Sequence, residues 1–176
     1  MYKEYLEQRI KEIILYILSK TDVTSYYKLM KILFCADRQN LVKYGSTITN
    51  LKYKALEHGP VPENLYSEIK GLQSGGSSNL SDIMNFVSKY YVSPKRNPNI
   101  DYLSKADKIS LDKAIEELGD MDYKQTESYL HDDIYKKVVN TKDKVYTVED
   151  IAKSGHATDE MLNYIQMQAE TAKMLL

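Results

Sequence analysis

Few side chains in this sequence could support catalysis or bind a metal. The three histidines are His58, His131 and His156. A helical metal site of the common kind needs two histidines one turn apart, and no two of these are four residues apart. His131 is followed directly by Asp132, but adjacent helix positions point in different directions. The spacing therefore predicts no metal site and no bound cofactor.

Candidate nucleophiles are equally scarce. Cys35 is the only cysteine and lies between Phe34 and Ala36, beside an apolar stripe, where a free cysteine usually packs as a small hydrophobe. No serine sits in a glycine-flanked elbow, and no glycine-rich loop leads into a lysine. These absences predict that the protein is not an enzyme. One alternative stays open, a metal- or His-dependent enzyme in which His58, His131 and nearby acids converge in one pocket.

The segment ALEHGPVPENLY, residues 55–66, is unusually dense in residues that restrict or release the backbone. Gly59 permits angles closed to other residues, whereas Pro60 and Pro62 fix their own φ and hold Val61 extended. Pro62 suits the first position of a helix. We therefore predict a structural corner at Gly59–Pro62, with His58 making a hydrogen bond within it rather than acting in catalysis.

Composition favours an ordinary globular protein. The chain has 176 residues, 24 basic and 25 acidic, which fits a single domain over residues 1–176. No apolar run is long enough to span a bilayer, and the first residues lack the features of a signal peptide, so a cytoplasmic location is expected. Sixteen tyrosines accompany two phenylalanines and no tryptophan. Tyrosine is enriched at protein interfaces, although an AT-rich genome would also raise its frequency.

The balanced charge argues against a dedicated nucleic-acid binder. An adaptor that contacts nucleic acid through Lys95 and Arg96 remains a further alternative, because these residues lie in a proline-bounded loop close to Tyr90 and Tyr91. Two adjacent basic residues are a weak signal, and a solvated hairpin tip is the better explanation for them.

The elements that position these residues follow from periodicity and capping. Helices are expected over 6–18, from Ser25 to Gly45, from Pro62 to about 72, from Ser104 to Gly119, from Asp122 to about Val138, and from about Thr158. A short helix at 82–86 and short strands at 48–56, 87–93, 100–103 and 145–148 complete the pattern, with the second and third strands forming a small hairpin. The expected fold is mainly α with a few short β-strands (α+β), a compact helical domain.

Residues 28–70 resemble a known family signature, that of the Panacea or SocA-like antitoxin domain. The helix motif K-L-x-K-L-L-Y-x-A-D is matched by Lys28-Leu29 through Ala36-Asp37, and the corner by Gly59–Pro62. The C-terminal half agrees more loosely: Ser104 opens one helix, and His131 stands where the family has a histidine. The tryptophan that usually follows that histidine is absent.

The resemblance implies a non-catalytic antitoxin of a bacterial or phage two-gene module, which neutralises a cognate toxin encoded nearby by binding it. No membrane contact is expected, and self-association stays open. Tyr26 and Tyr27, at the start of the second helix, join the motif positions as expected partner contacts. The full set of these expected contacts is Tyr26, Tyr27, Asp37, Arg38, Tyr53, His58, Tyr66 and His131.

Overall fold

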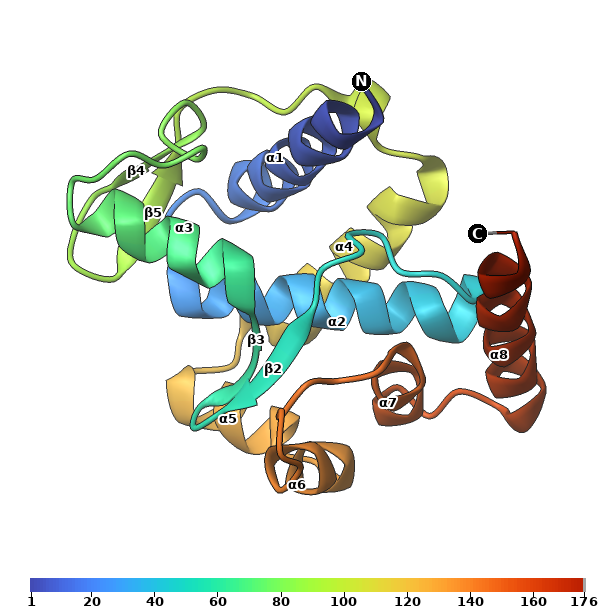
Figure 1. Cartoon of the computed structure of the whole chain (residues 1–176). Helices are drawn as coiled ribbons and strands as arrows, with labels where there is room; N and C mark the ends of the chain where they lie inside the picture. The colour runs from blue at the N-terminus through green and yellow to red at the C-terminus, as the bar shows by residue number, and fades with distance from the viewer. Residues whose placement is uncertain (176) are drawn as a thin grey trace.

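One long helix forms the centre of the molecule. The structure is a computed structural model that describes residues 1–175. Helix α2 (Tyr26–Tyr44) crosses the middle of the fold and contacts α1 (Tyr2–Thr21), α4 (Lys105–Gly119), α5 (Tyr123–Leu130) and α7 (Val148–Ser154) (Figure 1). Most of its side chains are buried, so the apolar residues predicted along one stripe form part of a core that surrounds the helix.

The ends of α2 are fixed as the sequence predicts. The Ser25 side chain accepts a hydrogen bond from the backbone N–H of Lys28 at the start. Gly45 ends the helix with φ of 77°, in the left-handed region that favours glycine. A Cβ at Gly45 would lie 2.5 Å from the ring of Tyr164, so the glycine also allows α8 (Asp159–Met174) to approach.

The predicted corner at Gly59–Pro62 is the second half of a β-hairpin. Strands β2 (Tyr53–Leu56) and β3 (Gly59–Pro62) pair antiparallel, with Glu57 and His58 at the tip. In this register Gly59 and Val61 face β2 with their backbone N–H groups, while Pro60 and Pro62 occupy the alternate positions. The prolines therefore remove no ladder bond. Helix α3 (Glu63–Gln73) begins one residue later than predicted, with Pro62 as its N-cap.

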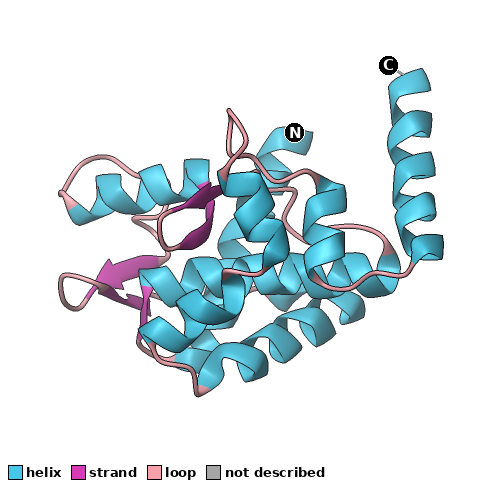
Figure 2. Ribbon diagram, turned by 90° about the horizontal axis from the view of Figure 1, so that it is seen from below, coloured by secondary structure: helices cyan, strands magenta, loops and turns pink. Residues whose placement is uncertain are grey.

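A three-stranded antiparallel sheet lies at the N-terminal end of α2, in the order β1 (Thr24–Ser25), β5 (Tyr91–Pro94), β4 (Met84–Phe86). Figure 2 shows both small sheets against the helices. Two predictions were wrong here. Met84–Phe86 is a strand rather than a helix, and the partner of β5 is β4, because Ile100–Tyr102 forms a 3-10 helix (η1) instead of a return strand.

The C-terminal half is divided more finely than predicted. The helix expected from Asp122 to Val138 breaks at His131, because the Asp132 side chain caps a new helix, α6 (Asp133–Val139), by accepting from the N–H of Tyr135. The strand expected at 145–148 is a single bridge between Val145 and Lys54. Helix α7 follows it, and α8 then stands at the edge of the molecule with Ile165 buried against the core (Figure 2).

The expected fold class is confirmed: residues 1–175 form eight α-helices and two small antiparallel sheets. No helix in this described part of the chain is both long enough and apolar enough to cross a membrane.

Candidate functional site

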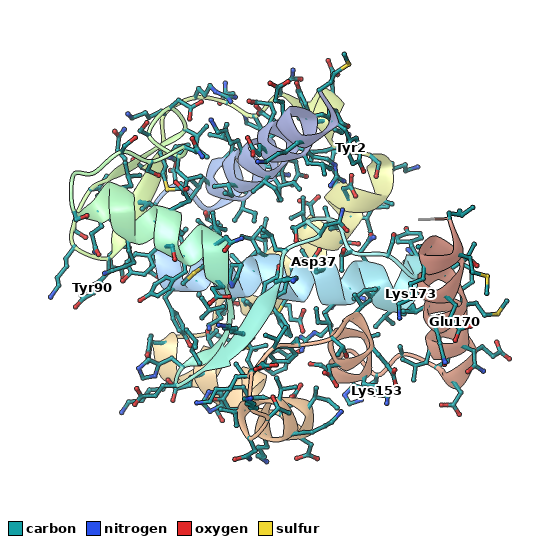
Figure 3. All side chains as sticks on the ribbon, viewed as in Figure 1. Tyr2, Asp37, Tyr90, Lys153, Glu170 and Lys173 are labelled. Carbon is teal, nitrogen blue, oxygen red and sulfur yellow. The ribbon has the colours of Figure 1, made fainter. Side chains whose placement is uncertain are left out.

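Asp37 lies at the centre of the molecule, in the middle of α2 (Figure 3), with no exposed surface. Its carboxylate accepts hydrogen bonds from the backbone N–H groups of Ile48 and Thr49, at 2.7 and 2.9 Å, and from the Tyr53 hydroxyl at 2.7 Å. The Thr49 hydroxyl also donates to it. Burial raises the pKa of this carboxyl, and the four donors oppose that shift. Asp37 therefore fixes the path from α2 to β2.

Arg38 joins four helices from the next position. Its guanidinium, 5% exposed, donates to Glu117 of α4 at 2.8 Å, to the Tyr129 hydroxyl of α5 at 3.0 Å and to Ser154 of α7 at 3.3 Å. Gly155 lets α7 approach, since a Cβ there would lie 2.7 Å from Arg38 Cγ. Asp37, Arg38 and Tyr53 are buried, so they have little or no exposed area with which to contact a partner. Their hydrogen bonds hold the surrounding elements in place instead.

Lys31 is a buried lysine that the sequence reasoning placed in the motif but assigned no role. Its ammonium donates to the carbonyl of Pro60 at 2.7 Å and lies 4.7 Å from the centre of the Tyr27 ring. Burial lowers the pKa of Lys31 to about 7. In the sequence, Lys31 lies one turn from both Tyr27 and Cys35, on a helix with apolar residues on every side. This position was the available signal that the lysine is buried. Lys31 holds the β2–β3 hairpin against α2.

His58 and His131 come together beside Glu127. The Nδ1 atom of His58, at the hairpin tip, lies 2.9 Å from the Glu127 carboxylate. The backbone carbonyl of His58 accepts a hydrogen bond from the Tyr27 hydroxyl. The His131 ring stacks on Tyr135 at 4.0 Å, and its buried Nε2 has no hydrogen-bond partner among the described residues. Burial lowers the pKa of His131; the Glu127 charge opposes this, and the charges of Lys31 and His58 add to it.

This convergence is the geometry that the enzyme alternative requires, but it offers few groups for chemistry. Lys31 has no exposed surface, and Cys35 is fully buried, with burial raising the pKa of its thiol to about 12. Within the described part of the chain, no group of three or more His, Cys, Asp or Glu residues is placed to hold a metal ion. The cluster instead connects α2, the hairpin tip and α5.

A groove with a volume of about 1170 Å³ opens beside this cluster. Its walls are the first turns of α2, the tip of the β2–β3 hairpin, the residues between α4 and α5, and β5. Six of its lining residues are tyrosines: Tyr26, Tyr27, Tyr66, Tyr90, Tyr91 and Tyr123. Figure 3 shows Tyr90 pointing outward at the edge of the molecule. The groove is therefore an aromatic surface built from segments far apart in the sequence.

The predicted contacts divide between this groove and the interior. Tyr26, Tyr27, His58 and Tyr66 line the groove. Tyr26 is only 9% exposed and packs on Tyr66 and Tyr90, with ring centres 6.4 and 6.3 Å apart, whereas Tyr27 lies 4.4 Å from Tyr123. The sequence predicted neither Tyr123 nor Tyr91 as a partner contact, although Tyr91 lies close to the basic loop; for Tyr123 the excess of tyrosine was the only signal.

The two basic residues of the nucleic-acid alternative are engaged within the protein. Arg96 donates two hydrogen bonds to the buried carboxylate of Glu12, at 2.7 and 3.0 Å. Lys95 donates to the carbonyl of Ser81 at 2.5 Å. Both therefore fasten the loop after β5 to its neighbours, and the arrangement gives the adaptor alternative no support.

Comparison with known proteins gives one match. A family model described as "Antitoxin SocA-like, Panacea domain" matches residues 29–135, which include α2 except for its first three residues, strands β2 to β5, and both His58 and His131. No curated protein and no solved structure matches the chain.

Proposed function

The chain belongs to the SocA-like antitoxin family of Panacea domains, and on that premise we propose that it is the antitoxin of a bacterial or phage toxin–antitoxin module. It acts by binding a toxin encoded beside it, in the cytoplasm, without catalysing a reaction. Family membership is the observation that carries this proposal. The groove beside α2 supports it, because a binding protein needs an accessible surface of suitable size and composition.

Exposed apolar side chains gather around that groove. Val23, Leu56, Tyr90, Tyr91 and Tyr123 all line it, with exposed fractions between 38 and 51%. Scattered exposed apolar residues are normal, but a contiguous group around a concavity is typical of a binding site. Tyrosine suits such a site because it supplies a large rigid surface and a hydrogen-bonding tip.

The physical mechanism is occlusion. A segment of the toxin that fills the groove buries the tyrosines. The antitoxin in turn covers that segment, so the toxin cannot reach its target. The supports beneath the groove are rigid: Lys31 and Glu127 hold the hairpin tip, and Asp37 holds the segment that leads into it. Binding to such a preformed surface loses little conformational entropy.

Co-expression with the product of the neighbouring gene tests the proposal. We expect that product to arrest growth alone and the present chain to restore growth. A harmless neighbour, or a toxic one that this chain fails to neutralise, would contradict an antitoxin function.

The groove is tested by a double variant. Tyr91→Ala with Tyr123→Ala removes two exposed rings, and interface aromatic residues contribute about 2 kcal/mol or more each when they are central. We therefore expect rescue to be lost while the protein stays folded. Tyr2→Ala is the matched control, because Tyr2 is 74% exposed on α1 and does not line the groove.

A further inference from the structure

The acidic residues of the groove make no close ion pair. Glu57 at the hairpin tip and Asp120 and Asp122 between α4 and α5 are exposed and line the groove. Within residues 1–175, none of the three has a lysine, arginine or histidine nitrogen within 4.0 Å. Asp122 caps α5, but the side chains of Glu57 and Asp120 make no hydrogen bond in the described structure. Burial lowers the pKa of Lys28, and the charge of Asp120 opposes that shift without a direct contact between the two side chains, whereas no described contact engages the Glu57 carboxylate.

The basic residues of the groove are, by contrast, all engaged. Lys20 pairs with Asp112 at 3.6 Å, and His58 with Glu127. Lys28 donates to the carbonyls of Gly119 and Met121, at 3.1 and 2.6 Å, below the connection between α4 and α5. Lys31 is fully buried against Pro60. Apart from Lys20 and His58, which have acidic partners, the groove is lined by three carboxylates and two lysines, and one of these lysines, Lys31, is fully buried. The charge that the groove presents to a partner is therefore negative on balance, although the whole chain is nearly neutral.

Aromatic rings flank these carboxylates. Tyr123 lies on the same wall, next to Asp122 in the chain, and Tyr27 packs against it. A guanidinium can stack on a tyrosine face while it donates to a carboxylate, and its planar shape suits both contacts at once. A lysine can pair with the carboxylates but matches the planar stacking less well.

We propose that the groove takes a basic, arginine-containing segment of the partner, whose apolar side chains lie on the tyrosines and whose guanidinium groups face Glu57 and Asp120. This identification rests on the proposed function for its biological setting. It deepens that function by specifying the chemistry of the toxin surface that becomes covered. Toxins that hold a nucleic acid or a nucleotide need such positively charged surfaces.

Two labelled peptides test the proposal without the toxin. They share the same tyrosine and leucine residues and differ only in carrying arginine or glutamate at the alternate positions. Fluorescence anisotropy with the full chain is expected to show binding of the arginine peptide, weakened by added salt, and roughly tenfold weaker binding of the glutamate peptide. Equal binding of both peptides, or binding of neither, overturns the proposal.

The charge-reversal variant Glu57→Lys with Asp120→Lys assigns the effect to the groove. Neither side chain makes a hydrogen bond or close ion pair in the described structure, so we expect thermal unfolding close to that of the wild type and roughly tenfold weaker binding of the arginine peptide. The matched control is Asp143→Lys with Glu160→Lys, which changes the net charge equally at exposed positions outside the groove. If the control weakens binding as much as the groove variant, the attraction is non-specific and the proposal fails.

The toxin assay separates this inference from the proposed function. If the wild-type chain neutralises the neighbouring gene product and Glu57→Lys with Asp120→Lys neutralises it equally well, the antitoxin function stands and the basic-segment proposal fails. If the wild-type chain does not neutralise it, the proposed function fails, and the peptide measurement still decides the chemistry of the groove.

Discussion

The Lys31 ammonium and the Pro60 carbonyl meet at 2.7 Å in the interior, where the lysine has no exposed surface. Burial lowers the pKa of Lys31 to about 7 in the folded protein, against about 10.4 for a lysine in an unfolded chain. Between these two values the unfolded chain binds one more proton, so the free energy of unfolding contributed by Lys31 rises with pH.

Lys31→Met removes this pH dependence. The unfolding free energy of the wild type should rise by a few kcal/mol from neutral pH to about pH 10, whereas that of the variant should lack this rise. The variant is therefore most stable relative to the wild type near neutral pH. Urea unfolding of both proteins across that range measures it. The lost hydrogen bond to Pro60 shifts the difference equally at every pH, so parallel pH curves would show that Lys31 is already charged in the fold.

Asp37→Ala should be severely destabilising. The change leaves two backbone N–H groups and the hydroxyls of Thr49 and Tyr53 without their acceptor in the core. We expect a loss of about 3–5 kcal/mol. Tyr53→Phe removes only one of the four donors and should cost about 1 kcal/mol. Chemical denaturation of the two variants measures both losses in unfolding free energy. Equal losses would contradict the role of Asp37 as an acceptor shared by four donors.

Gly59→Val should destabilise the hairpin before it affects partner binding. Gly59 has φ of 100°, and a Cβ there would lie 3.3 Å from Lys31 Nζ. A β-branched residue in this region costs about 1–3 kcal/mol in backbone strain alone. Gly75→Val is the control, with φ of 76° and open space around it, so the extra loss at Gly59 measures the crowding. A stable but inactive Gly59→Val protein would indicate instead that the hairpin contacts the partner directly.

Cys35 should resist modification while the protein is folded. It is fully buried, and burial raises the pKa of its thiol to about 12, so almost no reactive thiolate exists at neutral pH. Iodoacetamide should label the chain only as fast as it unfolds, and mass spectrometry after graded urea treatment can follow this. Rapid labelling of the native protein at the rate of a free thiol would disprove the burial of Cys35.

Local signals predicted the helices with strong caps. Ser104 with Asp107 and Asp122 with Gln125 form capping boxes in the structure, as their spacing indicates. Thr147 with Asp150 is a third capping box of the same kind, and it was the available signal for α7. Short apolar segments were harder to assign to helix or strand. The pairing between Met84–Phe86 and Tyr91–Pro94 depends on neighbours that a local pattern does not identify.

The candidate site was only partly predictable for a related reason. The helical repeat places Asp37 four residues after Leu33 and four before Leu41, which indicates an inward direction, yet a buried charge is rare enough that an exposed role was the natural expectation. The groove is assembled from five segments of the chain, so its tyrosines share no spacing in the sequence. Tertiary packing alone brings them together.

The alternating prolines of β3 have a consequence for dosage. If the chain neutralises a toxin by covering it, as proposed, at least one antitoxin molecule is needed for each toxin, and the chain would have to accumulate. Strands with free N–H groups along one side recruit further copies as concentration rises. On β3 the pyrrolidine rings of Pro60 and Pro62 occupy those positions, and Lys31 already holds the Pro60 carbonyl. The hairpin can therefore be abundant without becoming a template for its own aggregation.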